Sequence, residues 1–149
     1  MADCIALEDR LRERFGLAEC TVVPDIGDDE SLPLAALGQG GSAYLARVLE
    51  SGAHTVIGIG HGRTLSAVVD ALPRHGSRCQ TWVSLLGGLT RKFSANPYDV
   101  IFRLAEKSGE DAYFLPAPMF ADSVEDRRVM LGQTGLAEVV RRIDDASLC

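Results

Sequence analysis

The sequence has no long apolar run, little lysine and no surplus of positive charge. Its 15 Lys and Arg residues are outnumbered by 21 Asp and Glu residues, so the net charge is −6. Direct DNA contact by this chain is therefore disfavoured, because neutralising phosphates requires a clustered basic surface. No run approaches the roughly 18 apolar residues of a membrane span, and the start has no basic segment followed by an apolar stretch. We expect a soluble, cytoplasmic protein that makes no membrane contact.

Cysteine patterns of metal or disulfide sites are also missing. Cys4, Cys20, Cys79 and Cys149 include no Cys-x-x-Cys pair, and no histidine pair lies near them. We interpret them as reduced thiols and expect no metal and no cofactor. With 149 residues, of which 46% are hydrophobic and 24% charged, the chain has the size and composition of one globular domain.

Hydrophobic periodicity predicts an N-terminal helical region followed by alternating strands and helices. Gly38, Gly40 and Gly41 weaken the middle of the second predicted helix, for which Ser31 would be the cap. The alternation implies right-handed crossovers and a mostly parallel sheet, and thus a three-layer, Rossmann-like α/β domain. The predicted elements are a helix at 6–15, a strand at 20–23, a helix at 31–51, a strand at 54–59, a helix at 64–72, a strand at 80–86, a helix at 97–108, a strand at 112–115 and two helical stretches reaching 147.

The strongest local signal is a strand that runs into glycines and then directly into a helix, over 56–66. Glycines let backbone N–H groups approach an anion closely, and a helix N-terminus supplies unsatisfied donors and partial positive charge. Thr64 would add a hydroxyl and Arg63 a guanidinium. The spacing lacks the third glycine of a dinucleotide fingerprint and the lysine of a Walker loop, which disfavours NAD and ATP. The alternative is a tight turn in which Thr64 is an ordinary helix cap.

A second glycine turn, Gly87-Gly88, follows the next predicted strand. The carboxyl ends of parallel strands meet at one edge of a sheet, so we expect the two turns to form a cleft there. Asn96 either caps the following helix or contacts a ligand, and prolines after the third strand predict an extended cleft wall. The predicted ligand-binding residues are Gly60, His61, Gly62, Arg63, Thr64, Gly87, Gly88 and Asn96.

Signals for catalysis are weak. His61 is well placed in the first turn, but no residue is evident that would orient it as a base. Ser84 and Ser94 lack an evident histidine–acid pair for nucleophilic attack. Ser123, with acidic residues around it, is typical of a helix start and needs no functional role. We therefore predict no catalytic residue.

Together the motifs resemble the sugar-binding domain of the SorC family. The resemblance is carried by Gly58–Leu65, Leu86–Gly88, Asn96–Tyr98 and Tyr113–Pro118, and it extends from Leu7 to the end of the chain. It implies the effector domain of a bacterial transcription regulator, with a fold similar to ribose-phosphate isomerases and glucosamine-phosphate deaminases. A sugar or sugar phosphate is the implied ligand.

The resemblance also assigns parts of the ligand to individual residues. It implies the phosphate at Gly62, Arg63 and Thr64, the sugar against Gly87-Gly88, and a polar contact from Asn96. Leu86 departs from the pattern, because some relatives have a basic residue there. His61 stands where many relatives have an aromatic residue. Both departures predict a weaker phosphate site.

Family members also have an N-terminal helix-turn-helix and a longer effector domain than 149 residues provide. We therefore expect residues 1–149 to be a single, partial effector domain, which would contact DNA only through a helix-turn-helix outside it. The leading interpretation is non-catalytic sensing of a phosphorylated sugar within a homo-oligomer. A sugar-phosphate isomerase or deaminase is the enzyme alternative, since that fold is shared. An oligomerisation module without a ligand is the third.

Overall fold

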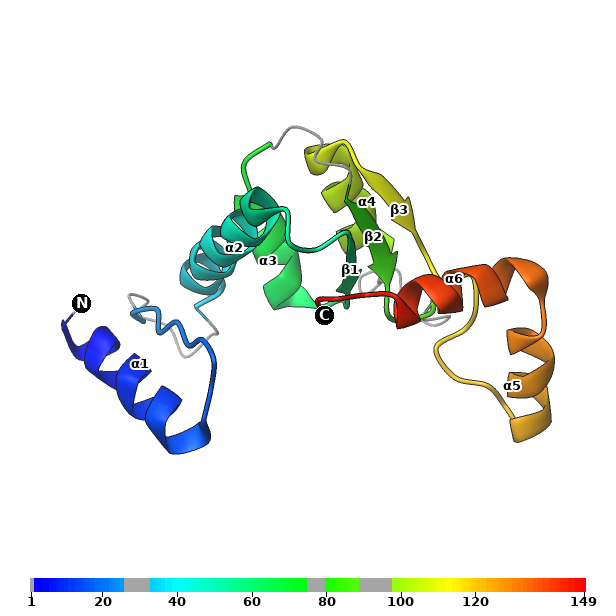
Figure 1. Cartoon of the computed structure of the whole chain (residues 1–149), viewed down its shortest axis with the longest axis horizontal. Coiled ribbons are helices and arrows are strands. Elements are labelled where there is room, and N and C mark those ends of the chain that lie inside the picture. The colour runs from blue at the N-terminus through cyan, green and yellow to red at the C-terminus, as the bar shows by residue number, and fades with distance from the viewer. Residues whose placement is uncertain (1, 26–32, 75–79, 89–97) are drawn as a thin grey trace.

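The structure is a computed structural model that describes residues 2–25, 33–74, 80–88 and 98–149. Its centre is a parallel sheet of three strands, β1 (Val56–Ile59), β2 (Thr81–Ser84) and β3 (Asp111–Tyr113), in that order (Figure 1). Each strand is shorter than its sequence pattern predicts. The predicted parallel α/β architecture is confirmed.

A fourth position of the sheet, beside β1, is taken by the end of the chain. The Gly58 amide donates to the Leu148 carbonyl at 2.8 Å, and the Ser147 amide donates to the Val56 carbonyl at 3.1 Å. The bridge between Ile57 and Leu148 is parallel. The chain thus steps from β1 to β3 in one direction and then returns to the opposite side of β1, which is the order of a Rossmann-like sheet.

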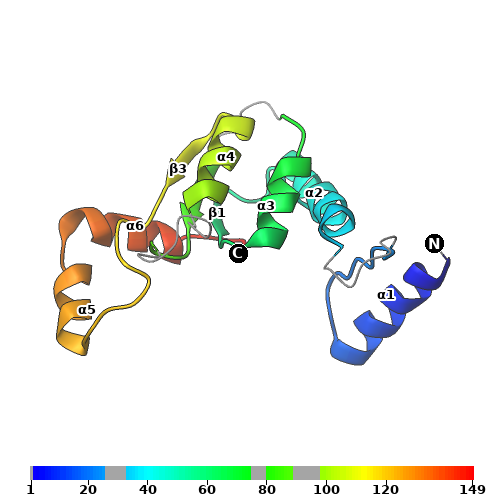
Figure 2. The ribbon, with the colours of Figure 1, turned by 180° about the vertical axis from the view of Figure 1, so that it is seen from behind.

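Helices cover both faces of the sheet. Figure 2 shows α4 in front of the strands with α3 beside it, whereas α6 packs against β1 and β2. Because the crossover through α6 runs back along the sheet, right-handedness places it on the other face. In the described part of the chain, no helix is long and apolar enough to cross a membrane. The helices are α1 (Ala2–Phe15), α2 (Leu34–Ser51), α3 (Arg63–Ala71), α4 (Tyr98–Ser108), α5 (Val124–Leu131) and α6 (Thr134–Asp144).

The glycines of α2 are explained by its packing against α3, beside which it lies in both views. A Cβ at Gly38 would lie 2.7 Å from the Ala67 carbonyl oxygen, and one at Gly41 would lie 2.5 Å from Val68 Cγ2. Any larger residue would push the two helices apart. Gly38 and Gly41, two of the glycines that weaken the helix pattern in the sequence, therefore let the two helices approach closely.

The core lies under α3 and α4 and fixes both helices on the sheet. Trp82 of β2 is fully buried, and its indole Nε1 donates to Ser108 Oγ at 3.0 Å. Lys107 of α4 donates to the carbonyl oxygens of Asp70 and Leu72, at 2.7 and 2.8 Å. An ammonium group at these carbonyls stabilises the C-terminal end of α3. This end of α3 is therefore held by its neighbour.

The predicted strand at 20–23 is wrong, because these residues are irregular. The Val22 amide donates to Glu8 Oε1 of α1 at 2.8 Å instead of to a neighbouring strand. A Cβ at Gly40 would lie 2.6 Å from Val23 Cγ1, so the segment packs against α2. Its β-branched residues favour a strand, but strand formation needs a partner, and none of the described strands pairs with it. Ser31, the predicted cap of α2, lies outside the described residues.

Candidate functional site

The two glycine turns follow neighbouring parallel strands. The Leu85 amide donates to the Ile59 carbonyl at 3.0 Å, just where β1 and β2 end. The structure therefore brings Gly60–Thr64 and Gly87-Gly88 to one edge of the sheet. Asn96, the remaining predicted ligand contact, lies outside the described residues.

The first turn also lies where the sheet changes direction. After β1 the chain builds outward to β3, whereas Ser147 and Leu148 pair with the other side of β1. In open parallel sheets, ligands bind beyond the carboxyl ends of the strands at such a switch point. Gly60–Thr64 follows β1 directly, so the fold and the sequence motif point to the same place.

The glycines at 58, 60 and 62, at the end of β1 and in the first turn, have different surroundings. A Cβ at Gly58, which lies in β1, would be 2.7 Å from Leu85 Cδ2 and 3.0 Å from Cys149 Sγ, so a larger residue there would have to displace these side chains. Gly62 has a φ of +137°, which L side chains rarely adopt. Among the described residues, a Cβ at Gly60 would meet only Leu65 Cδ1, at an ordinary 3.6 Å. The space beside Gly60 is thus open to a ligand.

No side chain in the described part of the chain caps the N-terminus of α3. Gly62 is the N-cap residue, and its carbonyl accepts the Ser66 amide at 2.9 Å. Thr64 is inside the helix and is not its cap, so the alternative in which Thr64 is an ordinary cap is wrong. Arg63 and Thr64 are both exposed. The first amides of α3 and these two side chains can therefore receive an anion together.

His61 is partly buried between Gly60 and Gly62. Its Nδ1 is buried and has no hydrogen-bond partner among the described residues. A general base needs a group that orients its ring, and the described part of the chain supplies none to this nitrogen. The geometry gives His61 a place at the site but no catalytic constellation.

The second turn is closed by the segment that follows β3. The Gly88 amide donates to the Ala117 carbonyl at 2.8 Å, and the Gly88 carbonyl accepts the Met119 amide at 3.0 Å. A Cβ at Gly87 would lie only 2.2 Å from that Ala117 oxygen. The close approach of the Ala117 carbonyl therefore explains why residue 87 is glycine. The expected cleft wall after β3 joins the second turn directly.

An open groove leads from the first turn toward α2. Its volume is about 410 Å³, and Thr64 belongs both to the groove and to the N-terminus of α3. We call it the α2–α3 groove. Glu19, Thr21 and Tyr44 also line it and supply a carboxylate and two hydroxyls. Sequence reasoning missed these three residues, because they come from segments far from the glycine motif and only folding brings them to it.

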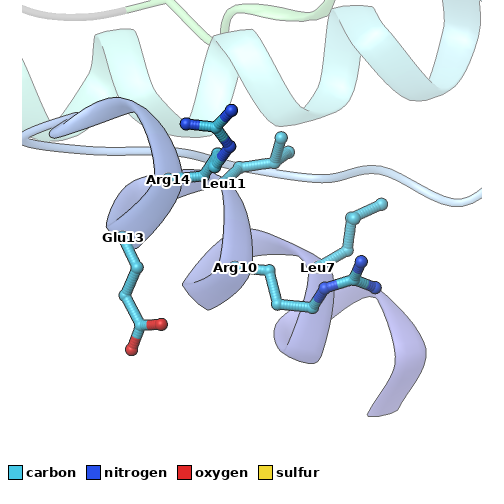
Figure 3. Close-up of a pocket in the computed structure, with 5 residues that line it drawn as sticks. All are labelled: Leu7, Arg10, Leu11, Glu13 and Arg14. Atoms are coloured by element: carbon cyan, nitrogen blue, oxygen red, sulfur yellow. The ribbon is translucent and has the colours of Figure 1, made fainter.

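A hollow of about 460 Å³ also lies along α1, and all of its lining residues come from that helix (Figure 3). Leu7 and Leu11 lie on it with arginines beside them, whereas Glu13 points away from the other labelled side chains. None of these residues follows a strand, whereas ligands of parallel sheets bind beyond the carboxyl ends of the strands. Among the described residues, no group of three His, Cys, Asp or Glu is placed to hold a metal ion.

A Rossmann-like sheet with an open helix N-terminus at its switch point is typical of α/β domains that bind small ligands. Comparison with protein families agrees, since the Sugar-bind model of sugar-binding domains matches residues 1–149. The chain belongs to this family of putative sugar-binding domains.

Individual relatives are all named as regulators. The chain is 54% identical over 139 residues to the erythritol catabolism regulatory protein EryD of Brucella abortus, covering 93% of this chain and 44% of EryD. It is 37% identical over 90 residues to the sorbitol operon regulator of Klebsiella pneumoniae, covering 60% of this chain and 28% of that protein. The chain thus spans less than half the length of these curated relatives.

Solved structures show the same fold. The full-length sorbitol operon regulator SorC of Klebsiella pneumoniae superposes with a TM-score of 0.88 at 24% identity, covering 97% of this chain and 47% of SorC. A sor operon regulator of Shigella flexneri gives a TM-score of 0.86 at 27% identity, covering 97% of this chain and 58% of that chain. The predicted fold class and the SorC resemblance are confirmed.

Proposed function

We propose that this chain is the effector-sensing part of a cytoplasmic transcription regulator and that it binds a phosphorylated sugar or polyol without transforming it. The observation that carries the proposal is the uncapped N-terminus of α3 beside the open space at Gly60. An anion there gains backbone hydrogen bonds and the favourable end of the helix dipole. The regulator names of the relatives support a sensing role over an enzymatic one.

Erythritol phosphate is the first ligand to test. EryD is named for erythritol catabolism, and the chain shares more than half of its aligned residues with EryD. Its phosphate fits the anion position at Gly62, Arg63 and Thr64, and Gly60 leaves room beside it. Binding would favour one of two regulator assemblies by no more than the ligand's difference in affinity for them.

Calorimetric titration of the chain with erythritol, erythritol phosphate and inorganic phosphate tests this function. We expect the phosphorylated polyol to bind more tightly than erythritol, and Thr64→Val to weaken it about tenfold through one lost hydrogen bond to a charged group. Thr134→Val is the matched control, because Thr134 begins α6, away from the site. No binding of any phosphate compound, or an equal effect of both variants, would refute the proposal.

Recovery of the compound after incubation with the chain separates sensing from catalysis. After incubation with erythritol phosphate, ribose phosphate or glucosamine phosphate, we expect the compound to be recovered unchanged. Turnover that is lost in His61→Ala would instead establish an isomerase or deaminase.

Self-association is a second proposed role, and exposed apolar residues on α1 favour it. Ile5 and Phe15 are 60% and 65% exposed. Asp3 lies in the first turn of α1 and Arg12 and Arg14 in the last, so antiparallel pairing with a second copy would bring opposite charges together. Light scattering should give a dimer, and Phe15→Ser should give a monomer. A wild-type monomer at micromolar concentration would exclude this interface.

A further inference from the structure

Building on the proposed function, we infer that Arg103 of α4 is a positioning residue for the effector. It holds the first turn of α3, and with it the amides proposed to receive the phosphate. Its guanidinium donates to two residues of α3, through Nη2 to Ser66 Oγ and through Nη1 to the Asp70 carboxylate. Ser66 lies only two positions after Thr64. In this role Arg103 acts through Ser66 and not on the ligand itself.

The first turn of α3 needs support from outside the helix. α3 has nine residues, and helices this short are marginal without tertiary contacts. No side chain among the described residues caps it, and a missing cap destabilises the first turn. The missing cap leaves the first amides open to an anion, but they bind it well only if the turn is already formed. The hydrogen bond from Arg103 to Ser66 provides this order and leaves the amides open.

The geometry of the contact favours arginine. Ser66 and Asp70 are four positions apart, so they lie on one face of α3, one helical turn from each other. A guanidinium carries its donors in a fixed planar fork and can reach both residues, whereas the ammonium of lysine is a single point charge. The Asp70 side chain is 59% exposed, so its ion pair with Arg103 adds little stability. Its effect is to orient the guanidinium toward Ser66.

A neighbouring ion pair provides a matched control. Arg74 Nη2 lies 3.8 Å from Glu106 Oε1 of α4, but Arg74 follows the end of α3 and its side chain is 79% exposed. Lys107 holds the same end of α3 through two carbonyl oxygens. Loss of Arg74 therefore removes a guanidinium that pairs with α4 and leaves the first turn of α3 in place.

Calorimetry with inorganic phosphate and erythritol phosphate tests the inference on variants shown to be folded by circular dichroism. We expect Arg103→Met to weaken both compounds about tenfold, because apparent affinity falls with the ordered fraction of the turn and one charge-assisted hydrogen bond shifts that fraction by about this factor. Ser66→Ala should have a similar effect. The double variant should bind no more weakly than Arg103→Met, because both residues act through one bond. Arg74→Met should bind like wild type.

Arg103→Lys separates positioning from charge. It keeps the positive charge but loses the fork, so we expect it to bind both compounds as weakly as Arg103→Met. Binding like that of wild type would overturn the inference, because the charge of residue 103 would then be what matters. Additive losses in the double variant would overturn it too, since the two residues would then act separately.

Amide hydrogen exchange separates positioning from a general loss of stability. The Ser66 amide donates to the Gly62 carbonyl at 2.9 Å in the first turn of α3, and the Leu72 amide donates to the Val68 carbonyl at 3.0 Å at its end. In Arg103→Met, exchange should become about tenfold faster at Ser66 and stay unchanged at Leu72. Equal acceleration at both amides would overturn the inference, because Arg103 would then stabilise the whole helix.

The outcomes separate the inference from the proposed function. If wild type binds the two phosphate compounds and Arg103→Met binds them equally well, the role of Arg103 is overturned and the proposed function stands. If neither compound binds to wild type, the proposed function fails, and the positioning role that rests on it fails as well.

Discussion

The two glycine turns look alike in the sequence, yet the structure gives them opposite surroundings. At the first turn, a Cβ on Gly60 would make one ordinary contact at 3.6 Å. At the second, a Cβ on Gly87 would meet a backbone oxygen at 2.2 Å, and both backbone groups of Gly88 are hydrogen-bonded. A glycine can therefore create open space for a ligand, or it can allow two backbones to touch. Only the packed structure distinguishes the two roles.

Gly87→Ala is the change with the largest expected effect. Its new methyl group would push the second turn away from Ala117, and overpacking of this kind costs about 3 kcal/mol of unfolding free energy. The midpoint of urea denaturation should therefore fall clearly. An unchanged midpoint would show that the contact between the second turn and the Ala117 segment is unimportant for stability.

Gly60→Ala should have the opposite effects, leaving stability unchanged and weakening ligand binding. Among the described residues the added methyl meets only Leu65, so the free energy of unfolding should stay within about 0.5 kcal/mol of wild type. It would, however, occupy the space proposed for the ligand. We expect the affinity for erythritol phosphate to fall about tenfold, which is about 1.4 kcal/mol. Undiminished binding would remove the distinction between the turns.

Leu86→Lys is the smallest change and asks whether the second turn faces the ligand at all. Leu86 is partly buried directly before Gly87. A lysine there should raise phosphate affinity by no more than about fivefold, as expected for an exposed charge pair of at most about 1 kcal/mol. The gain should disappear at high salt. Calorimetry with inorganic phosphate at two salt concentrations measures both effects, and weaker binding than wild type would contradict the expected geometry.

Much of the fold was predictable because it depends on local pattern. The alternation of apolar strands with amphipathic helices gave the parallel sheet, and the acidic residues around Ser123 gave the start of α5, where Ser123 Oγ accepts the Asp126 amide at 3.0 Å. The predicted strand at 20–23 was wrong because it does not depend on local pattern alone. Its residues favour a strand, but pairing depends on distant parts of the chain.

The candidate site was predictable only in its first half. Gly60–Thr64 is contiguous, so one motif contains the glycines, the helix start and the hydroxyl. The closure of Gly87-Gly88 by Ala117 and Met119 joins residues some thirty positions apart. Glu19 and Tyr44 likewise reach Thr64 only through the packing of α2 on α3. No local pattern contains these relationships.

The position of Leu148 beside β1 also affects how the sheet assembles. Val56 and Ser147 are separated by 91 positions, so this edge pairing requires a much longer loop to close than β1 with β2. The sheet can therefore form from β1 to β3 before its last edge is added. Local opening of that edge frees the Gly58 amide, whose acceptor is the Leu148 carbonyl. Amide exchange at the strand leading into the first turn thus reports on the docking of the C-terminal residues.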